Sequence, residues 1–212
     1  ASGYTIANKS GLDISVVMAG DGQMNPIHLT RLLDPIVIGF ADYTKTNRLF
    51  DIESRSTIPR KRYVGNFILS IFTKVSSGYW KISDSQSGYT ALRMSRVAGF
   101  DWNKMYSGYG QPNDLLAILN FYNLVVVDIN TPPVYNVGEK SKLRIRKVVF
   151  TIPLILIRRF VWRMWNKYVI RHPHPLVIFF FISFCTTLFS LVFLANIGFK
   201  FITLGNVPVI ST

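Results

Sequence analysis

Residues 16–26 read VVMAGDGQMNP, and this stretch contains the transition that decides the fold. A β-branched run, typical of a short buried strand, ends at Asp21, which lies between two glycines. Asn25 and Pro26 then match the cap and the first position of a helix. In α/β sheets, functional groups gather where strands end, so we predict that Asp21 and Gln23 belong to a site.

The same alternation of strand and helix patterns continues through residue 128. Strand-like segments lie at residues 12–19, 41–48 and 124–130, and helix-like segments at residues 1–11, 25–39, 62–77 and 113–123. This alternation predicts an α/β fold with a mostly parallel sheet and helices on its faces. Between the second strand and its helix, the polar and basic residues 51–62 predict a loop.

The composition excludes several classes of protein. At 49% hydrophobic residues, the 212-residue chain is too apolar to be disordered. Its single cysteine, Cys185, excludes both a disulfide framework and a cysteine metal cluster. The net charge of +13 is concentrated late in the chain, where Glu139 is the only acid after Asp128. A basic tail of this kind suits either nucleic acid or anionic lipid.

A long apolar segment decides between these two partners. Residues 176–199 contain no charged side chain, and as a helix they would extend for about 36 Å. A bilayer core is about 30 Å thick, so this segment predicts a membrane span. The basic residues precede the span and only Lys200 follows it, which predicts a cytoplasmic location for the N-terminal part. We therefore expect membrane lipids, and no nucleic acid, as partners.

The segment before the span has a different pattern. In residues 150–171, Arg159, Arg163, Lys167 and Arg171 recur at a spacing of four, which predicts one basic stripe on a helix. Apolar and aromatic residues occupy the remainder, so we predict a helix lying in the membrane interface with its cations near lipid phosphates.

These patterns divide the chain into three parts. We predict a globular part at residues 1–147, an amphipathic interfacial helix at residues 148–172 and a membrane-spanning segment at residues 173–212.

Three clusters of polar residues suggest the chemistry of the site. A carboxylate and an amide, Asp21 and Gln23, suit a hard divalent cation shared with phosphate oxygens; the alternative is that Asp21 only caps a turn. The segment SDSQSGYTALR places Asp84 and Ser87 in one turn-like cluster, in which Asp84 could equally be a loop or helix cap.

The third cluster precedes the interfacial helix. Lys140, Lys142 and Arg144 could bind a phosphate that protrudes from the bilayer, or could be attracted generally to anionic headgroups.

The order of the motifs DGQMNP, ADYTKTNR, SDSQSGYTALR, QPNDLL and YNVGEKSKLR resembles family-two glycosyltransferases. Among them it is most similar to the dolichyl- or polyprenyl-phosphate sugar transferases, such as dolichyl-phosphate mannosyltransferases. The resemblance implies a GT-A fold, which is Rossmann-like, together with a nucleotide-sugar donor and Mg²⁺ or Mn²⁺. In that family an Asp-x-Asp with a following Gln holds the metal; here Asp21 and Gln23 match, and Ala19 replaces the first Asp.

The resemblance also implies that a strand is missing. The family's N-terminal half supplies a strand that grips the nucleotide base, and no such strand precedes residue 12. We therefore expect a partial GT-A domain, a fragment that is inactive alone.

The function implied is an inverting sugar transfer from a nucleotide-sugar to a polyprenyl or dolichyl phosphate, at the cytoplasmic face of the plasma membrane or endoplasmic reticulum. We predict that Arg48, Arg62 and Ser87 bind phosphate of the donor or acceptor. Two alternatives stay open: a glycosyltransferase that extends a glycan at a hydroxyl acceptor, and a non-catalytic membrane-associated module. A hydroxyl acceptor would need a base, for which Asp114 and then Asp84 are the candidates.

Overall fold

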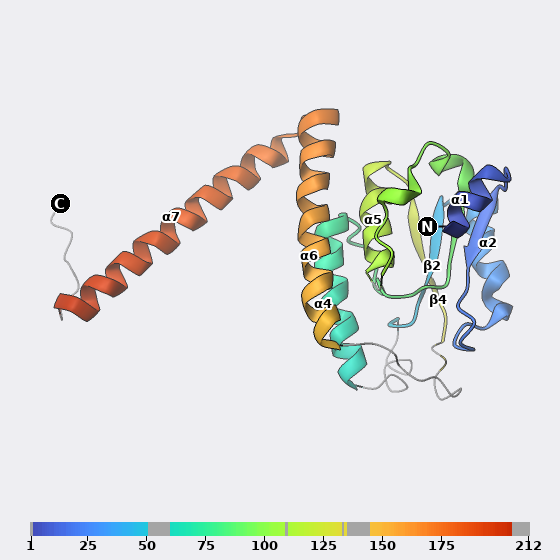
Figure 1. Cartoon of the computed structure of the whole chain (residues 1–212), viewed down its shortest axis with the longest axis horizontal. Coiled ribbons are helices and arrows are strands. Elements are labelled where there is room, and N and C mark those ends of the chain that lie inside the picture. Colours follow the sequence, from blue (N-terminus) through green and yellow to red (C-terminus); the bar gives the residue numbers. More distant parts are fainter. Residues whose placement is uncertain (1, 51–59, 109, 133, 135–144, 205–212) are drawn as a thin grey trace. The chain divides into compact units, whose positions relative to one another are not determined.

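A computed structural model of the chain describes residues 2–50, 60–108, 110–132, 134 and 145–204 (Figure 1). The chain divides into two compact units, Ala1–Arg163 and Met164–Thr212, and each is considered by itself.

The described residues of the first unit form a mixed four-stranded sheet. Its strands are β1 (Ile14–Val17), β2 (Tyr43–Asn47), β3 (Thr90–Arg93) and β4 (Val126–Asn130), in the order β1-β3-β2-β4. Strand β3 pairs antiparallel with both β1 and β2, whereas β2 and β4 pair in parallel. The prediction of a mostly parallel sheet is therefore wrong.

The reason is the strand that the sequence pattern did not reveal. The residues TALR looked like part of a turn-like connection, but they form β3 and insert between β1 and β2. The chain reaches β3 at the edge where β1 and β2 end, so β3 runs back against both of them. Strands β1, β2 and β4 consequently share one direction, and their carboxyl ends meet the start of β3 at one edge of the sheet.

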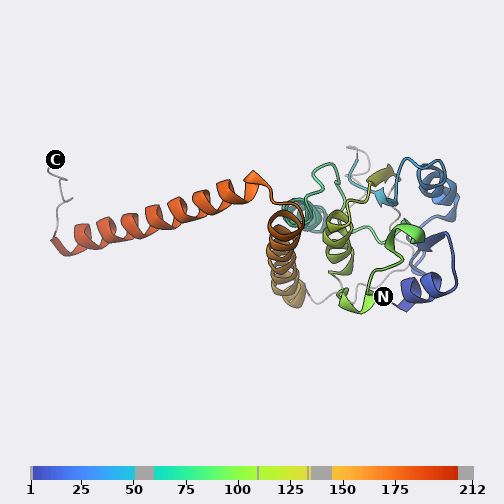
Figure 2. The ribbon, with the colours of Figure 1, turned by 90° about the horizontal axis from the view of Figure 1, so that it is seen from above.

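Helices pack around this sheet (Figure 2). They are α1 (Ser2–Lys9), α2 (Leu29–Val37), α4 (Arg60–Ser77), α5 (Gln111–Phe121) and α6 (Ile145–Arg163), with short turns η1 (Pro26–His28), η2 (Met94–Val97) and η3 (Trp102–Lys104). The predicted cap of the second segment is confirmed, because the Asn25 side chain accepts a hydrogen bond from the Ile27 amide at 3.0 Å. Gly39, with a φ of +80°, follows the end of α2 as predicted.

The main core lies where α5 packs. Leu115, Leu116 and Leu119 of α5 are buried together with Tyr43 of β2 and Leu92 of β3. Strand β1 behaves differently, since Val16 and Val17 are exposed. The prediction of a buried first strand is wrong because β1 is an edge strand that pairs, within the described residues, only with β3.

The second unit contains a π-helix, η4 (Met164–Arg171), and the long helix α7 (Pro175–Leu204). Within the described residues, Pro175–Thr203 is the one helix long and apolar enough to cross a membrane, which agrees with the predicted span. The interfacial helix expected at residues 148–172 is not one regular helix, because the α-helical pattern ends at Arg163 and continues as π-turns.

Candidate active site

Four of the predicted site residues lie in segments at the sheet edge where β1, β2 and β4 end. Asp21 follows β1, Arg48 follows β2, and Asp84 and Ser87 precede β3. The turn after β1 and the loop before β3 are close together, since a Cβ added at Gly88 would lie 3.4 Å from the Met24 Cε atom. Functional groups of an α/β sheet are expected at this edge, and a functional role for these residues stays a prediction.

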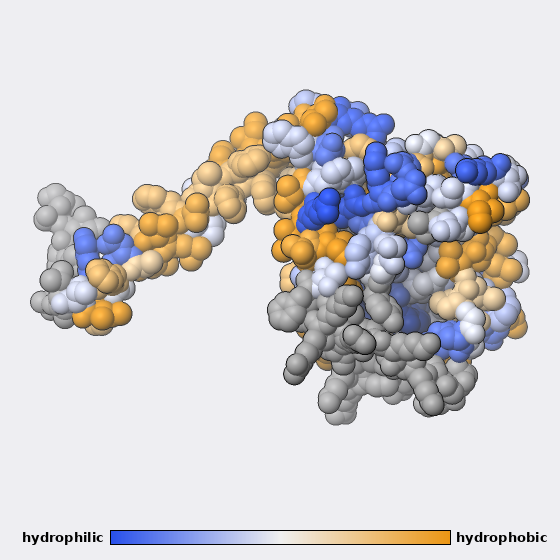
Figure 3. Space-filling view, viewed as in Figure 1, coloured by the Kyte–Doolittle hydropathy of each residue, from blue (hydrophilic) through white to orange (hydrophobic). Residues whose placement is uncertain are grey.

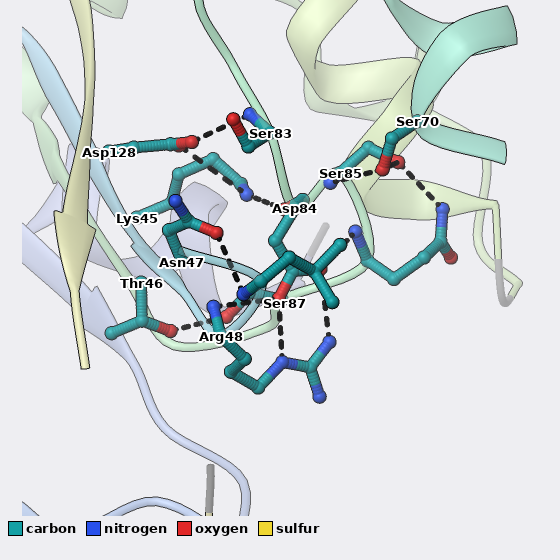
Figure 4. A network of polar contacts seen from close by, with 12 residues as sticks. Lys45, Thr46, Asn47, Arg48, Ser70, Ser83, Asp84, Ser85, Ser87 and Asp128 are labelled. Carbon is teal, nitrogen blue, oxygen red and sulfur yellow. Dashed lines mark hydrogen bonds and ion pairs between the residues drawn. The ribbon is translucent and has the colours of Figure 1, made fainter. Parts of the chain in front are cut away.

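Asp84 and Arg48 form a two-pronged ion pair (Figure 4). The Arg48 Nε atom donates to Asp84 Oδ2 at 2.6 Å, and Nη2 donates to Oδ1 at 3.1 Å. The backbone amides of Arg48 and Gln86 also donate to this carboxylate. Asp84 is fully buried, whereas the Arg48 side chain is partly exposed, so the pair presents its cationic side toward solvent.

The environment fixes the charge of Asp84. Burial by itself would raise the pKa of this carboxyl, but the Arg48 charge, its hydrogen bonds and the Lys45 charge together hold the pKa below its ordinary value. Asp84 is therefore an ionised, weakly basic carboxylate.

A buried lysine supports the same loop from the sheet. Lys45, in the middle of β2, donates to the Asp84 backbone carbonyl, and its Nζ atom lies 3.8 Å from Asp128 Oδ1 on β4. Asp128 also accepts from the Ser83 amide at 2.7 Å. Burial raises the pKa of Asp128 although Lys45 opposes that shift.

Sequence reasoning missed this lysine and its partner. The available signal was one opposite charge in each of two strand-like runs, YTKTN and VVDIN, which a parallel pairing brings side by side.

Ser87 is buried against β2. Its hydroxyl forms a hydrogen bond with the Thr46 hydroxyl, and its amide contacts the Asp84 carbonyl at 3.5 Å. A phosphate-binding role for Ser87 stays a prediction.

Asp21 and Gln23 form a turn of their own. The exposed Asp21 carboxylate accepts a hydrogen bond from the Gln23 amide at 3.1 Å, which is the turn-capping arrangement. Among the described residues, the buried Gln23 side-chain nitrogen has no hydrogen-bond partner, so this amide retains capacity for a ligand.

The fit of these residues to a divalent cation can be judged from their donors. The part of the chain that the structure describes contains no group of three or more His, Cys, Asp or Glu side chains able to hold a metal. One exposed carboxylate and one amide can supply two oxygen ligands, so a Mg²⁺ or Mn²⁺ ion would need the rest from phosphate and water. These two side chains alone do not enclose a cation, so Mg²⁺ or Mn²⁺ binding by Asp21 and Gln23 stays a prediction.

Asp114 lies in the first turn of α5 and its carboxylate points toward α6. It pairs with the Arg159 guanidinium, whose Nη2 donates to Asp114 Oδ2 at 2.9 Å, and it accepts from the Tyr106 amide at 2.8 Å. Its neighbour Asn113, also missed, contacts the site loop by accepting from Gln86 Nε2 at 2.9 Å. A base role for Asp114 stays a prediction, and the carboxylate is buried in an ion pair.

The predicted basic stripe is wrong for its first two members. Arg159 pairs with Asp114, and Arg163 donates from Nε to the Ser76 carbonyl at 2.8 Å and from Nη2 to the Val75 carbonyl at 2.9 Å. Arg163 thus caps the C-terminal carbonyls of α4. The spacing of four predicted one stripe facing lipid phosphates, but the Arg159 and Arg163 side chains contact the globular unit instead.

Some predicted residues cannot be placed. Lys140, Lys142 and Arg144 lie outside the described residues, and so does the side chain of Arg62.

Comparison with known proteins gives distant similarity. No protein-family model matches the chain. It is 31% identical, over 96 residues, to the UDP-N-acetylglucosamine–dolichyl-phosphate N-acetylglucosaminyltransferase of Methanococcus voltae, covering 45% of this chain and 38% of that protein. It is 30% identical, over 129 residues, to an uncharacterized protein of Methanocaldococcus jannaschii, covering 61% of this chain and 53% of the relative. The matched region spans about half or less of each relative, and the first similarity supports the resemblance to family-two glycosyltransferases.

Proposed function

We propose that this chain is part of a membrane-bound inverting glycosyltransferase that moves a sugar from a nucleotide-sugar to a dolichyl or polyprenyl phosphate. The observation that carries the proposal is the Arg48–Asp84 pair, which holds the Arg48 guanidinium against the loop before β3, and that loop approaches the turn after β1 at Gly88 and Met24. The similarity to a dolichyl-phosphate transferase and the membrane-span candidate α7 support it.

The charge state of the carboxylates favours a phosphate acceptor over a hydroxyl acceptor. A hydroxyl nucleophile needs a base with a pKa near the working pH, whereas the pKa of Asp84 is lowered by Arg48 and Asp114 is held by Arg159. A lipid monophosphate has a second pKa near ~6, by analogy with phosphorylated side chains, and is already anionic at pH 7. It can attack the anomeric carbon without a strong base.

The residues then divide into those that touch ligands and those that position them. Arg48 donates to a phosphate of the donor or acceptor, and Asp84 orients the Arg48 guanidinium. Lys45, on β2, holds the Asp84 loop by donating to the Asp84 backbone carbonyl. Asp21 and Gln23 hold Mg²⁺ or Mn²⁺ shared with the donor diphosphate, with Ala19 where a second carboxylate would stand. That cation, when bound, stabilises negative charge on the leaving nucleoside diphosphate.

Membrane attachment places the acceptor within reach. In this proposal α7 crosses the bilayer and the globular unit faces the cytoplasm, consistent with the basic residues that precede the span. Lys140, Lys142 and Arg144, together with Arg62, would contact lipid phosphate there.

The proposal is tested with the full-length protein in membranes and a panel of radiolabelled nucleotide sugars that includes UDP-N-acetylglucosamine. We expect transfer into an organic-extractable, mild-acid-labile lipid, and a fall of at least tenfold for Arg48→Ala. The matched control is Arg96→Ala, because Arg96 is also paired to an aspartate, Asp42, at 3.2 Å but is more than half exposed. The control should retain activity.

Other outcomes would replace this function. Label found only in polysaccharide would indicate the hydroxyl acceptor. Absence of transfer with every nucleotide sugar, from a folded and membrane-inserted protein, would indicate the non-catalytic module.

A further inference from the structure

Helix α4 buries its polar side and exposes its apolar side, which is the reverse of an ordinary surface helix. Its inward face consists of small hydroxyl side chains, each at most 3% exposed: Ser70, Thr73, Ser76 and Ser77. Its outward face consists of large apolar side chains that are 41–54% exposed: Val64, Phe67, Ile68, Ile71, Phe72 and Val75. These outward positions recur at spacings of three and four, so they form one continuous stripe along the helix.

Helix α6 continues this apolar surface. Leu154, Ile157 and Val161 are all more than half exposed and lie on one side of α6. Helices α4 and α6 lie side by side, and both also pack against α5 (Figures 1 and 2). The faces turned away from α5 therefore lie on the same side of the pair, and Figure 3 shows hydrophobic atoms at the position of α6. We call these nine residues the α4–α6 face.

Three features of the chain identify what covers the α4–α6 face. First, a soluble domain rarely exposes so large a contiguous apolar surface. Second, the same chain carries α7, a membrane-span candidate. Third, neither α4 nor α6 contains an acidic residue, and both begin at basic sequence, RKR at residues 60–62 and IRK at residues 145–147. Both helices begin at the same end of the pair, so these basic residues suit anionic headgroups at that end (Figure 1).

We propose that the α4–α6 face is immersed in the acyl-chain region of a lipid bilayer, so that the globular unit contacts the membrane itself in addition to α7. The inference deepens the proposed function, on which it rests only for the presence of a membrane. It assigns α4, which the sequence patterns placed in the globular part, to lipid.

The opposite side of α4 supports the candidate active site. The Ser85 amide donates to the Ser70 hydroxyl at 3.2 Å, and the two serine hydroxyls lie 3.3 Å apart. Ser85 follows Asp84 directly, so one helix separates the lipid-facing stripe from the loop that holds Arg48. A lipid phosphate arriving from the bilayer would therefore reach the site past α4.

The test uses the full chain in vesicles of phosphatidylcholine and phosphatidylglycerol, with Cys185→Ser removing the native cysteine. Single cysteines are introduced as Ile71→Cys, Ile157→Cys and, as a control on an exposed polar position, Ser95→Cys, and are labelled with an environment-sensitive fluorophore. With brominated acyl chains, we expect at least a twofold loss of fluorescence at positions 71 and 157 and less than a tenth at position 95. Equal, weak quenching at all three positions would overturn the proposal.

A second measurement separates lipid from protein partners. Energy transfer between copies labelled at position 71, measured in detergent and in vesicles, should be absent when the protein is diluted in lipid. Transfer that persists on dilution, with no quenching by brominated chains, would assign the face to a second copy. Neither measurement needs sugar transfer, so failure of the proposed function would leave the quenching result unchanged.

Discussion

Helices α4 and α5 pack against each other but bury opposite kinds of side chain. Helix α5 buries an unbroken run, Leu115–Leu119 in the sequence LLAIL, whereas α4 buries serines and a threonine and exposes its large apolar residues. Both helices are rich in Leu, Ile and Phe, so composition does not distinguish them. The two helices show that the positions of the hydroxyl side chains around the helix axis decide which side of the helix faces the domain. The number of apolar residues does not decide it.

The largest expected effect comes from separating α5 from α6. Arg159→Met leaves the buried Asp114 carboxylate at the start of α5 without its ion-pair partner, which should lower the free energy of unfolding by about 3–5 kcal/mol. The measurement is denaturant unfolding of the full chain in detergent micelles. An exposed arginine on α2 gives the control, Arg31→Met, with an expected change within about 0.5 kcal/mol. Equal losses in both variants would show that the pair does not anchor the helices.

The direct test of the comparison truncates one apolar residue in each helix. Leu116→Ala in α5 opens a cavity in the core and should cost about 2–5 kcal/mol in the same detergent assay. Ile71→Ala in α4 removes an exposed side chain and should cost less than about 1 kcal/mol. Similar losses of unfolding free energy in the two variants would contradict the exposure of the apolar side of α4.

The loop between α4 and β3, which contains Asp84, should make the stability depend on pH. The pKa of Asp84 is lowered in the folded protein, so its ionised form contributes stability that is present above the ordinary aspartate pKa of about 3.9. That contribution is lost as the pH falls through the lowered pKa. Asp84→Asn should be less stable than the wild type at pH 5–7, and the gap should shrink below about pH 4. A gap that stays constant down to pH 2.5 would contradict the assigned charge state.

The smallest expected effect concerns the inward face of α4. Ser70→Ala leaves the buried Ser85 amide without its acceptor and should cost about 1–2 kcal/mol in the detergent assay. Ser95→Ala, at an exposed serine, should be nearly neutral. If Ser70→Ala is instead stabilising, the inward hydroxyls are not what holds α4 against the loop.

Helix starts and ends could be predicted from the sequence where a capping residue or a glycine determines them. The Asn25 cap and the helix end at Gly39 each act within a few residues, and each was predicted from the sequence. Strand β3 was missed because four residues, TALR, follow a loop of serines and a glycine and carry little pattern of their own.

The site was predicted in part, for a related reason. Asp21 and Arg48 each follow a strand-like run that the sequence pattern indicates, whereas Asp84 reaches the same sheet edge through β3, which the pattern did not reveal. The Lys45–Asp128 contact depends on which strands are neighbours, and the inward turn of Arg159 and Arg163 depends on how α6 is rotated about its axis. A spacing of four fixes a stripe but does not say which side of the helix faces the domain.

Among the described residues, no strand pairs with the outer edge of β1, and this edge has a practical consequence. Its four residues, ISVV, contain neither proline nor a charged side chain, and Val16 and Val17 are exposed. Such an edge is a template for adding a further strand, from another molecule as readily as from another segment. A preparation of this polypeptide at high concentration should therefore tend to associate through β1, and a lysine introduced at Val16 should suppress that association.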